Sequence, residues 1–241
     1  LFNVVGIVMS QNLTNTVPVV AIDGPTASGK GAVAQAVAQR LGFHYLDSGA
    51  LYRLVALQAI RAGWTSDTTL DVVHEQQLAQ WASTLDVCFE GDVIALAGED
   101  VGNTIRAEDV GNMASKIATV GVLREALLQR QRDFAQPMGL VADGRDMASV
   151  VFPNATVKIF LTADAQIRAE RRYKQLIDKG FSANITDLEK IVVDLNARDE
   201  QDRNRAFAPL KPVADAFVLD TSQMGLEQAI QTVIERFHQA I

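Results

Sequence analysis

VPVVAIDGPTASGKGA, residues 17–32, joins an unbroken apolar run to a glycine-rich loop that ends in a lysine and two small residues. A short β-branched run of this kind is typical of a strand that is buried on both faces of a parallel sheet. Residues 30–41 then have the apolar spacing of a helix, with a buried face predicted to contain Ala34, Val37, Ala38 and Leu41. Strand, loop and helix in this order predict a phosphate-binding loop and a bound nucleoside triphosphate.

The loop departs from the usual pattern G-x-x-x-x-G-K-[ST] at its last position. Gly31 follows Lys30 where a hydroxyl is expected, and Ala32 comes next. Backbone amides cradle the phosphates in such a loop, so the substitution leaves the cradle intact. The loop alone does not separate a kinase from a GTPase, an ATPase or a binding protein, but the chain has no N-K-x-D guanine motif.

The composition is that of an ordinary globular protein, with 241 residues, 48% of them hydrophobic and 21% charged. A chain of this size forms one domain, or one domain with an insertion. The net charge of -7 argues against a nucleic-acid polymer as partner, because such binding depends on a basic face. Cys88 is the single cysteine, which suits the cytosol, and it is predicted to be a small buried apolar residue.

Residues 1–16 are interpreted as an N-terminal tail, with Met9 as a candidate natural start. The apolar segment 1–8 is short and lacks a basic flank, so it predicts neither a signal peptide nor a membrane span. His44, His74 and His238 are scattered without metal-ligand spacing. The chain has no coiled-coil pattern, and a cytoplasmic monomer without membrane contact is expected.

Strand-like runs at 43–47, 139–143, 156–163 and 216–220 alternate with helical patterns along the rest of the chain. Together with the first strand they predict an α/β fold whose five-stranded core sheet is mostly parallel. The segment 85–101 differs, because its apolar residues alternate around a Glu-Gly-Asp turn and predict an antiparallel hairpin.

These patterns predict a core of residues 17–63 and 123–241 that is interrupted by an inserted subdomain at 64–122. Two helices, 164–179 and 186–204, flank the segment GFSAN and predict a lid at about 168–205 that closes over bound phosphates.

Arginines are clustered in this acidic chain, at "DGRD", "RAERR" and "RDEQDRNR". The guanidinium fork binds phosphate through paired hydrogen bonds, so these clusters favour a site for several anions. On a helix, Arg198, Asp202 and Arg205 share one face with the carboxylate between the arginines. A surface salt-bridge stripe would have the same spacing, and each of Arg168, Arg171 and Arg172 could equally belong to a solvated face.

Five motifs, taken together, resemble those of the bacterial cytidylate kinases among the nucleoside monophosphate kinases. They are "AIDGPTASGKG", "LDSGALYR", "ADGRDM", "VFPNATVKIFLTA" and "RDEQDRNR" followed by "APL". The resemblance runs in the same order from Pro18 to the C-terminal helix. It implies a P-loop α/β/α fold of three layers, with an enlarged monophosphate-binding subdomain at the insertion and a short helical lid.

The resemblance also implies the reaction of ATP with CMP or dCMP to give ADP and CDP or dCDP, in pyrimidine nucleotide metabolism. The implied ATP-binding residues are Gly24, Pro25, Thr26, Ala27, Ser28, Gly29, Lys30, Gly31 and Ala32. The implied CMP-binding residues are Ser48, Arg53, Ser115, Arg124, Arg145, Asp146, Arg198, Asp202 and Arg205. Among these residues, Ser115, Arg124 and Asp146 would read the cytosine. Catalytic roles are implied for Lys30, Arg145, Arg205, Arg171 and Arg172.

The residues after Lys30 affect the expected magnesium site, because the bacterial cytidylate kinases that this chain resembles commonly have threonine at the position of Ala32. We expect no direct protein ligand, and a Mg²⁺ held mainly by ATP oxygens and water. Asp143, Thr26 or Ser28 would help to hold that water. Two alternatives stay open, a P-loop kinase for another small acceptor such as UMP or an alcohol, and a nucleotide-binding regulator without turnover.

Overall fold

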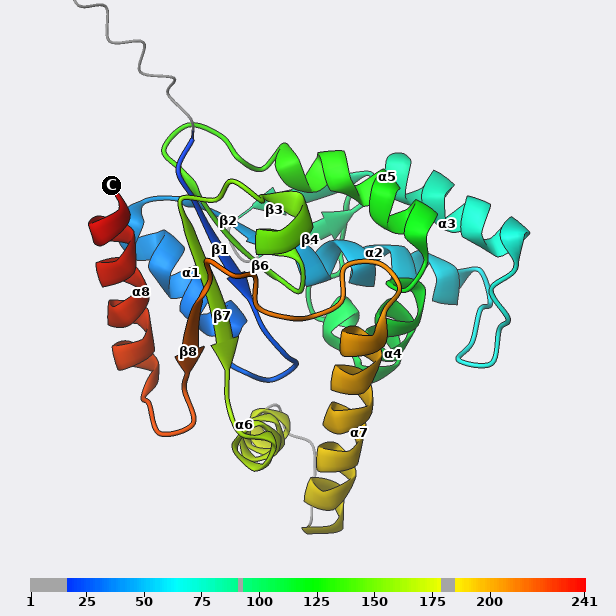
Figure 1. Ribbon diagram of the computed structural model, residues 1–241. Coiled ribbons are helices and arrows are strands. Elements are labelled where there is room, and N and C mark those ends of the chain that lie inside the picture. The colour runs from blue at the N-terminus through cyan, green and yellow to red at the C-terminus, as the bar shows by residue number, and fades with distance from the viewer. Residues whose placement is uncertain (1–16, 91–92, 179–184) are drawn as a thin grey trace, which may run out of the picture.

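The computed structural model describes residues 17–90, 93–178 and 185–241, and its core is a five-stranded parallel sheet (Figure 1). The strands, in the order β2-β6-β1-β7-β8, are β2 (His44–Asp47), β6 (Leu140–Gly144), β1 (Val19–Asp23), β7 (Val157–Thr162) and β8 (Phe217–Asp220). All residues of the central β1 are buried, as its unbroken apolar sequence predicts. The register sets Asp23 opposite Gly144, so the carboxyl ends of β1 and β6 lie side by side.

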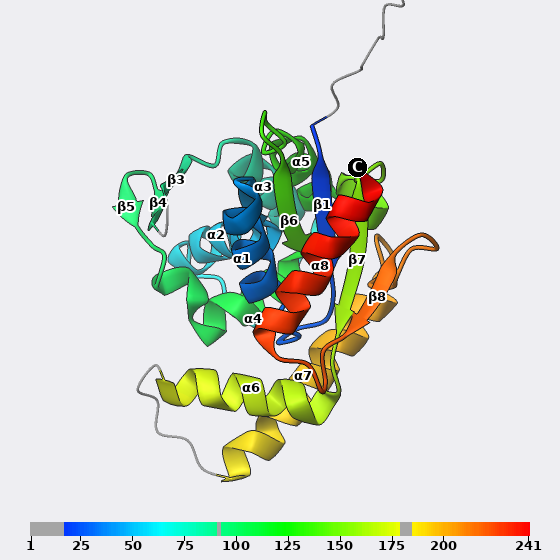
Figure 2. The same cartoon turned by 90° about the vertical axis from the view of Figure 1, so that its left-hand side faces the viewer.

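Helices cover both faces of this sheet and confirm the predicted three layers. α1 (Lys30–Leu41) and α8 (Leu226–Ala240) pack on one face (Figure 2). On the opposite face, the sheet shares one hydrophobic core with α2 (Ser48–Arg61), α3 (Val72–Ser83), α4 (Glu108–Ile117), α5 (Gly121–Arg132), the 3₁₀ turn η1 (Thr104–Arg106) and the π-helical turn η2 (Met147–Val151). α2 begins at Ser48, where the Asp47 carboxylate accepts a hydrogen bond from the Ala50 amide and caps the helix.

A second sheet is antiparallel and contains β3 (Val87–Glu90), β4 (Val93–Leu96) and β5 (Glu99–Asp100). β3 and β4 pair as the predicted hairpin, and the turn at 91–92 lies outside the described residues. The short β5 is an addition to the prediction, because two exposed acidic residues carry no alternating pattern.

The prediction that Cys88 is buried is wrong, because its side chain is exposed on β3. Successive side chains of a strand point to opposite faces. Val87 and Phe89, on either side of Cys88, pack against the hydrophobic core, and this phase turns the cysteine outward.

α6 (Ala165–Asp178) and α7 (Ile185–Asn204) lie past the carboxyl ends of the strands, at the place of the predicted lid (Figure 1). The predicted tail at 1–16 and the lid tip at 180–184 lie outside the described residues. The limits of the inserted subdomain and the closure of the lid stay predictions. In the described part of the chain, no helix has both the length and the apolar character needed to cross a bilayer.

Candidate active site

A cleft of about 1530 Å³ lies at the carboxyl ends of β2 and β6 and beside the glycine-rich loop. Ligands of open α/β sheets bind at this edge, and a pocket for one drug-sized ligand has about 300–1,000 Å³. The predicted site residues that line the cleft are Thr26, Ala27, Gly29, Lys30, Gly31, Ala32, Ser48, Arg53, Ser115, Arg124, Asp143, Arg145, Asp146, Arg171, Arg172, Arg198, Asp202 and Arg205. Its volume therefore leaves room for two small anionic ligands side by side.

Three other predicted residues, Gly24, Pro25 and Ser28, belong to the loop but are not among the described residues that line the cleft. Gly24 is required by packing, because a Cβ there would lie 2.1 Å from the Leu161 carbonyl oxygen of β7. Gly29 has a φ of +92°, which favours glycine. The buried Ser28 hydroxyl has no hydrogen-bond partner among the described residues.

Lys30 is the first residue of α1 and borders the cleft. Its Nζ donates a long hydrogen bond, of 3.5 Å, to the Pro25 carbonyl oxygen. Burial, followed by the charge of Arg145, lowers the pKa of Lys30 from its ordinary value. A phosphate in the loop would stabilise the charged ammonium, so the site is electrostatically suited to an anion.

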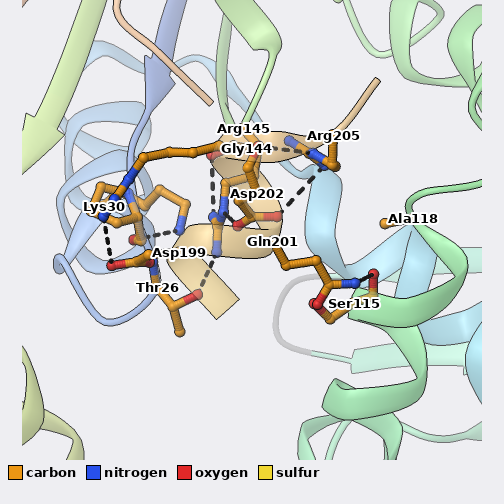
Figure 3. Close-up of polar contacts among 12 residues, drawn as sticks. Thr26, Lys30, Ser115, Ala118, Gly144, Arg145, Asp199, Gln201, Asp202 and Arg205 are labelled. Atoms are coloured by element: carbon orange, nitrogen blue, oxygen red, sulfur yellow. Dashed lines mark hydrogen bonds and ion pairs between the residues drawn. The ribbon is translucent and has the colours of Figure 1, made fainter. Parts of the chain in front are cut away.

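Arg145 connects the glycine-rich loop to α7 (Figure 3). Its Nη2 donates to Thr26 Oγ1 at 2.8 Å, and its Nε donates to Asp202 Oδ2 at 2.7 Å. The buried Asp23 accepts hydrogen bonds from the backbone amides of residues 147 and 148, both at 2.8 Å, and so fixes the turn that follows. Burial raises the pKa of Asp23 to about 6. The Arg145 guanidinium is thus held between the loop and α7.

Asp202 contacts Arg145 and Arg205, whereas the sequence spacing suggests Arg198 and Arg205. Its Oδ1 lies 3.7 Å from Nη1 of Arg205, a residue with only 8% of its surface exposed, and its other partner is Arg145. Arg198 instead donates to the side-chain oxygen of Asn112 on α4. The expectation that Arg198 and Arg205 both flank the carboxylate is therefore corrected, because α4 lies within reach of Arg198.

Four arginines, from four elements, gather around one part of the cleft, where Asp47 and Glu108 offset only part of their charge. Burial lowers the pKa of Arg53, and the charges of Arg198, Arg172 and Arg106 lower it further against the opposing effect of Asp47. Burial and Arg198 likewise lower the pKa of Arg172. Mutual repulsion of this kind is relieved when an anion binds between the cations.

The other arginines of α6 hold the glycine-rich loop. Arg171 donates to the carbonyl oxygens of Ser28 (3.2 Å) and Thr221 (2.6 Å), while it also borders the cleft. Arg168 is buried and pairs with Asp199 at 2.6 Å, and it donates to the Thr26 carbonyl oxygen at 3.0 Å. The alternative that Arg168 belongs to a solvated face is therefore wrong.

A second region of the cleft is lined by small side chains and contains one buried ion pair. Arg124 of α5 pairs with Asp146, and its guanidinium lies 5.6 Å from the centre of the Tyr52 ring. The Ser115 hydroxyl donates to the side-chain oxygen of Gln201 at 3.2 Å, and the Gln201 amide donates back to the Ser115 carbonyl oxygen at 3.2 Å (Figure 3). Ser48, in contrast, directs its hydroxyl to the buried Gln131 at 2.8 Å.

The structure adds residues that sequence reasoning missed, namely Tyr45, Gly111, Asn112, Asp199 and Gln201. One signal was available: Gly111, Ala114, Ser115 and Ala118 repeat small residues at helical spacing, and all four line the cleft. A helix face without bulky side chains leaves room for a ligand. The other missed residues are single polar side chains without a motif.

Comparisons with known proteins agree with this geometry. The family model described as "Cytidylate kinase" matches residues 20–239. The chain is similar to a cytidylate kinase of Cupriavidus pinatubonensis, with 57% identity over 92% of this chain and 96% of that protein. It is also similar to one of Bordetella pertussis, with 55% identity over 90% of this chain and 94% of that protein. One of Chromobacterium violaceum is 53% identical over 93% of this chain and 97% of its own length.

Proposed function

This chain belongs to the cytidylate kinase family, and on that premise we propose that it transfers the γ-phosphoryl group of ATP to CMP and dCMP. A phosphate oxygen of the acceptor forms a bond to the γ-phosphorus while the bond to ADP breaks. The products are ADP and CDP or dCDP. We further propose that the protein works as a monomer in the cytoplasm.

The observation that carries this proposal is the position of Arg145. The guanidinium contacts Thr26 of the glycine-rich loop on one side and Asp202 on the other. ATP would bind at the loop, and the acceptor phosphate would bind among Arg53, Arg205 and the neighbouring arginines. Phosphoryl transfer requires two anions to be brought together in line, so positioning and compensating charge are the main tasks of the protein.

The ion pair of Arg124 and Asp146 supports cytosine as the base. Cytosine presents an amino donor beside the N3 acceptor, whereas uracil presents an oxygen acceptor beside an N3–H donor. Asp146 can accept from the amino group, and Arg124 can donate to N3 or O2. Uracil would place acceptor against acceptor and donor against donor, which leaves buried groups unpaired.

Mg²⁺ is proposed to accompany ATP, and the residues present fit an ion that keeps most of its water. The Asp143 carboxylate stands at the end of β6 and borders the cleft. Nowhere in residues 17–90, 93–178 or 185–241 do three His, Cys, Asp or Glu side chains come together as a metal site. In the proposed complex Asp143 would help to hold a hydrated ion, whose charge would offset that of the phosphates.

An assay of ADP release tests the proposal. Purified protein with ATP and Mg²⁺ is offered CMP, dCMP, UMP and AMP in parallel reactions. Fast turnover with CMP and dCMP, and little with UMP and AMP, is the expected result. Turnover with another acceptor alone would favour a different P-loop kinase. ATP binding without any turnover would favour the regulator and overturn the proposal.

Replacing Gly111 by alanine is expected to raise the KM for CMP about 10-fold, with a smaller change in kcat. A Cβ at position 111 would lie 3.0 Å from Arg53 Nη2, so the guanidinium must shift by a few tenths of an ångström. Helix propensity favours alanine by about 1 kcal/mol, so the melting temperature should not fall with the affinity. Steady-state kinetics and thermal unfolding check both effects.

Gly225→Ala is the control, because no heavy atom of the described residues, apart from its chain neighbours, would lie within 4 Å of its added Cβ. An unchanged KM for CMP in Gly111→Ala would contradict the assignment of Arg53 to the acceptor.

A further inference from the structure

The region beside Gly31 contains a hydroxyl, although the glycine-rich loop does not supply it. A Cβ built on Gly31 would lie 3.7 Å from the phenol oxygen of Tyr45 and 3.9 Å from Oδ2 of Asp143. Both distances are ordinary contacts, so a serine side chain would have been directed toward these same two groups. Ala32, the next residue, is exposed and has no polar atom in its side chain.

Tyr45 reaches this point from a neighbouring strand. β2 pairs with β6 in the order Tyr45 opposite Val141 and Asp47 opposite Asp143, so the tyrosine comes from the same sheet edge as the carboxylate. The phenol donates a hydrogen bond of 2.8 Å to Asp143 Oδ1 and borders the cleft. A phenol that has used its proton in this way keeps lone pairs that can accept a hydrogen bond.

We propose that Tyr45 supplies a hydroxyl in place of the one that is absent directly after Lys30, and that it acts with Asp143 as a positioning residue for the hydrated Mg²⁺ of the ATP complex. The inference rests on the proposed function, since it concerns the ion that accompanies ATP. Groups that orient the surroundings of a metal in this way typically change its affinity by about 10–100-fold. The oxygen would come from β2 rather than from the residue after Lys30, and a serine or threonine at that position would therefore not be required.

Tyr45→Phe tests the role of the hydroxyl, because it keeps the ring and removes one oxygen. Binding of Mn²⁺, as a probe for Mg²⁺, is measured by electron paramagnetic resonance on the protein with a non-hydrolysable ATP analogue. We expect about 10-fold weaker Mn²⁺ binding. The affinity for the analogue without metal, measured by calorimetry, should stay within about twofold, since the amide cradle is unchanged.

The double variant Gly31→Ser/Tyr45→Phe tests the position. Its serine hydroxyl would project into the space that the phenol oxygen leaves, and most of the lost Mn²⁺ affinity should return. Equal Mn²⁺ binding by the wild type and Tyr45→Phe would overturn the proposal. An equal loss of affinity for the metal-free analogue would also overturn it, because Tyr45 would then be a structural support of the loop. A double variant that recovers none of the lost Mn²⁺ affinity would overturn it as well.

Turnover of CMP by the wild-type protein is measured in the same preparations. An active wild type with no metal effect in Tyr45→Phe would refute only the role of Tyr45. An inactive wild type that still binds the analogue would refute the proposed function.

Discussion

Arg145→Lys is expected to lower kcat for CMP phosphorylation by about 10²–10³-fold, the range seen when one transition-state hydrogen-bond donor is removed. Arginine holds Thr26 and Asp202 through different nitrogens of one planar group. Lysine keeps the charge but offers a single ammonium, which cannot keep both bonds and also face the phosphates. Binding of ATP should weaken much less than kcat falls, because the loop amides and Lys30 remain.

Arg203→Lys is the matched control for this experiment. Arg203 lies on α7, the helix that carries Asp202, but its side chain is 63% exposed and its carboxylate partner is 4.0 Å away. Steady-state kinetics should give this variant a nearly wild-type kcat. A mild loss in Arg145→Lys, comparable to that in the control, would show that Arg145 is not the link between the two substrates.

The parts of the fold that were predictable depend on local sequence. The apolar run of β1, the glycines after it and the first turn of α1 are adjacent in the chain, and each has its own conformational preference. Gly24 and Gly29 are required for different reasons, since one lies against β7 and the other has a positive φ. The phase of β3 was not predictable in the same way, because the alternation around Cys88 does not say which face meets the core.

The site was predictable in its residue types but not in its pairings. The hydrogen bond of Arg145 to Thr26 joins residues 119 positions apart, and neither helical nor strand spacing relates them. Arg198 donates a hydrogen bond to Asn112 rather than to Asp202, because α4 and α7 approach each other at this point. The contact of Gly111 with Arg53 likewise depends on the packing of α2 against α4. Such contacts follow from tertiary packing, which one sequence does not contain.

Asp146→Asn is expected to lower kcat/KM for CMP by about 10²–10³-fold and to reduce the preference for CMP over UMP by about 10²-fold. The two side chains of the Arg124–Asp146 pair are only 10% and 7% exposed. Loss of the carboxylate leaves the Arg124 charge poorly compensated in a buried position, which costs affinity for either nucleotide. Asparagine can turn its amide to donate to the uracil oxygen, whereas aspartate can only accept from the cytosine amine.

Asp86→Asn serves as the control, because Asp86 is an exposed carboxylate just before β3 and is not among the described residues that line the cleft. Parallel kinetics with CMP and UMP separate two effects of Asp146→Asn. A simple loss of packing would lower both rates by the same factor and leave their ratio unchanged, which would contradict base reading by Asp146. A fall in the ratio requires that the residue distinguishes a donor from an acceptor at the same position of the ring. Only a group that faces the base edge in the productive complex can do so.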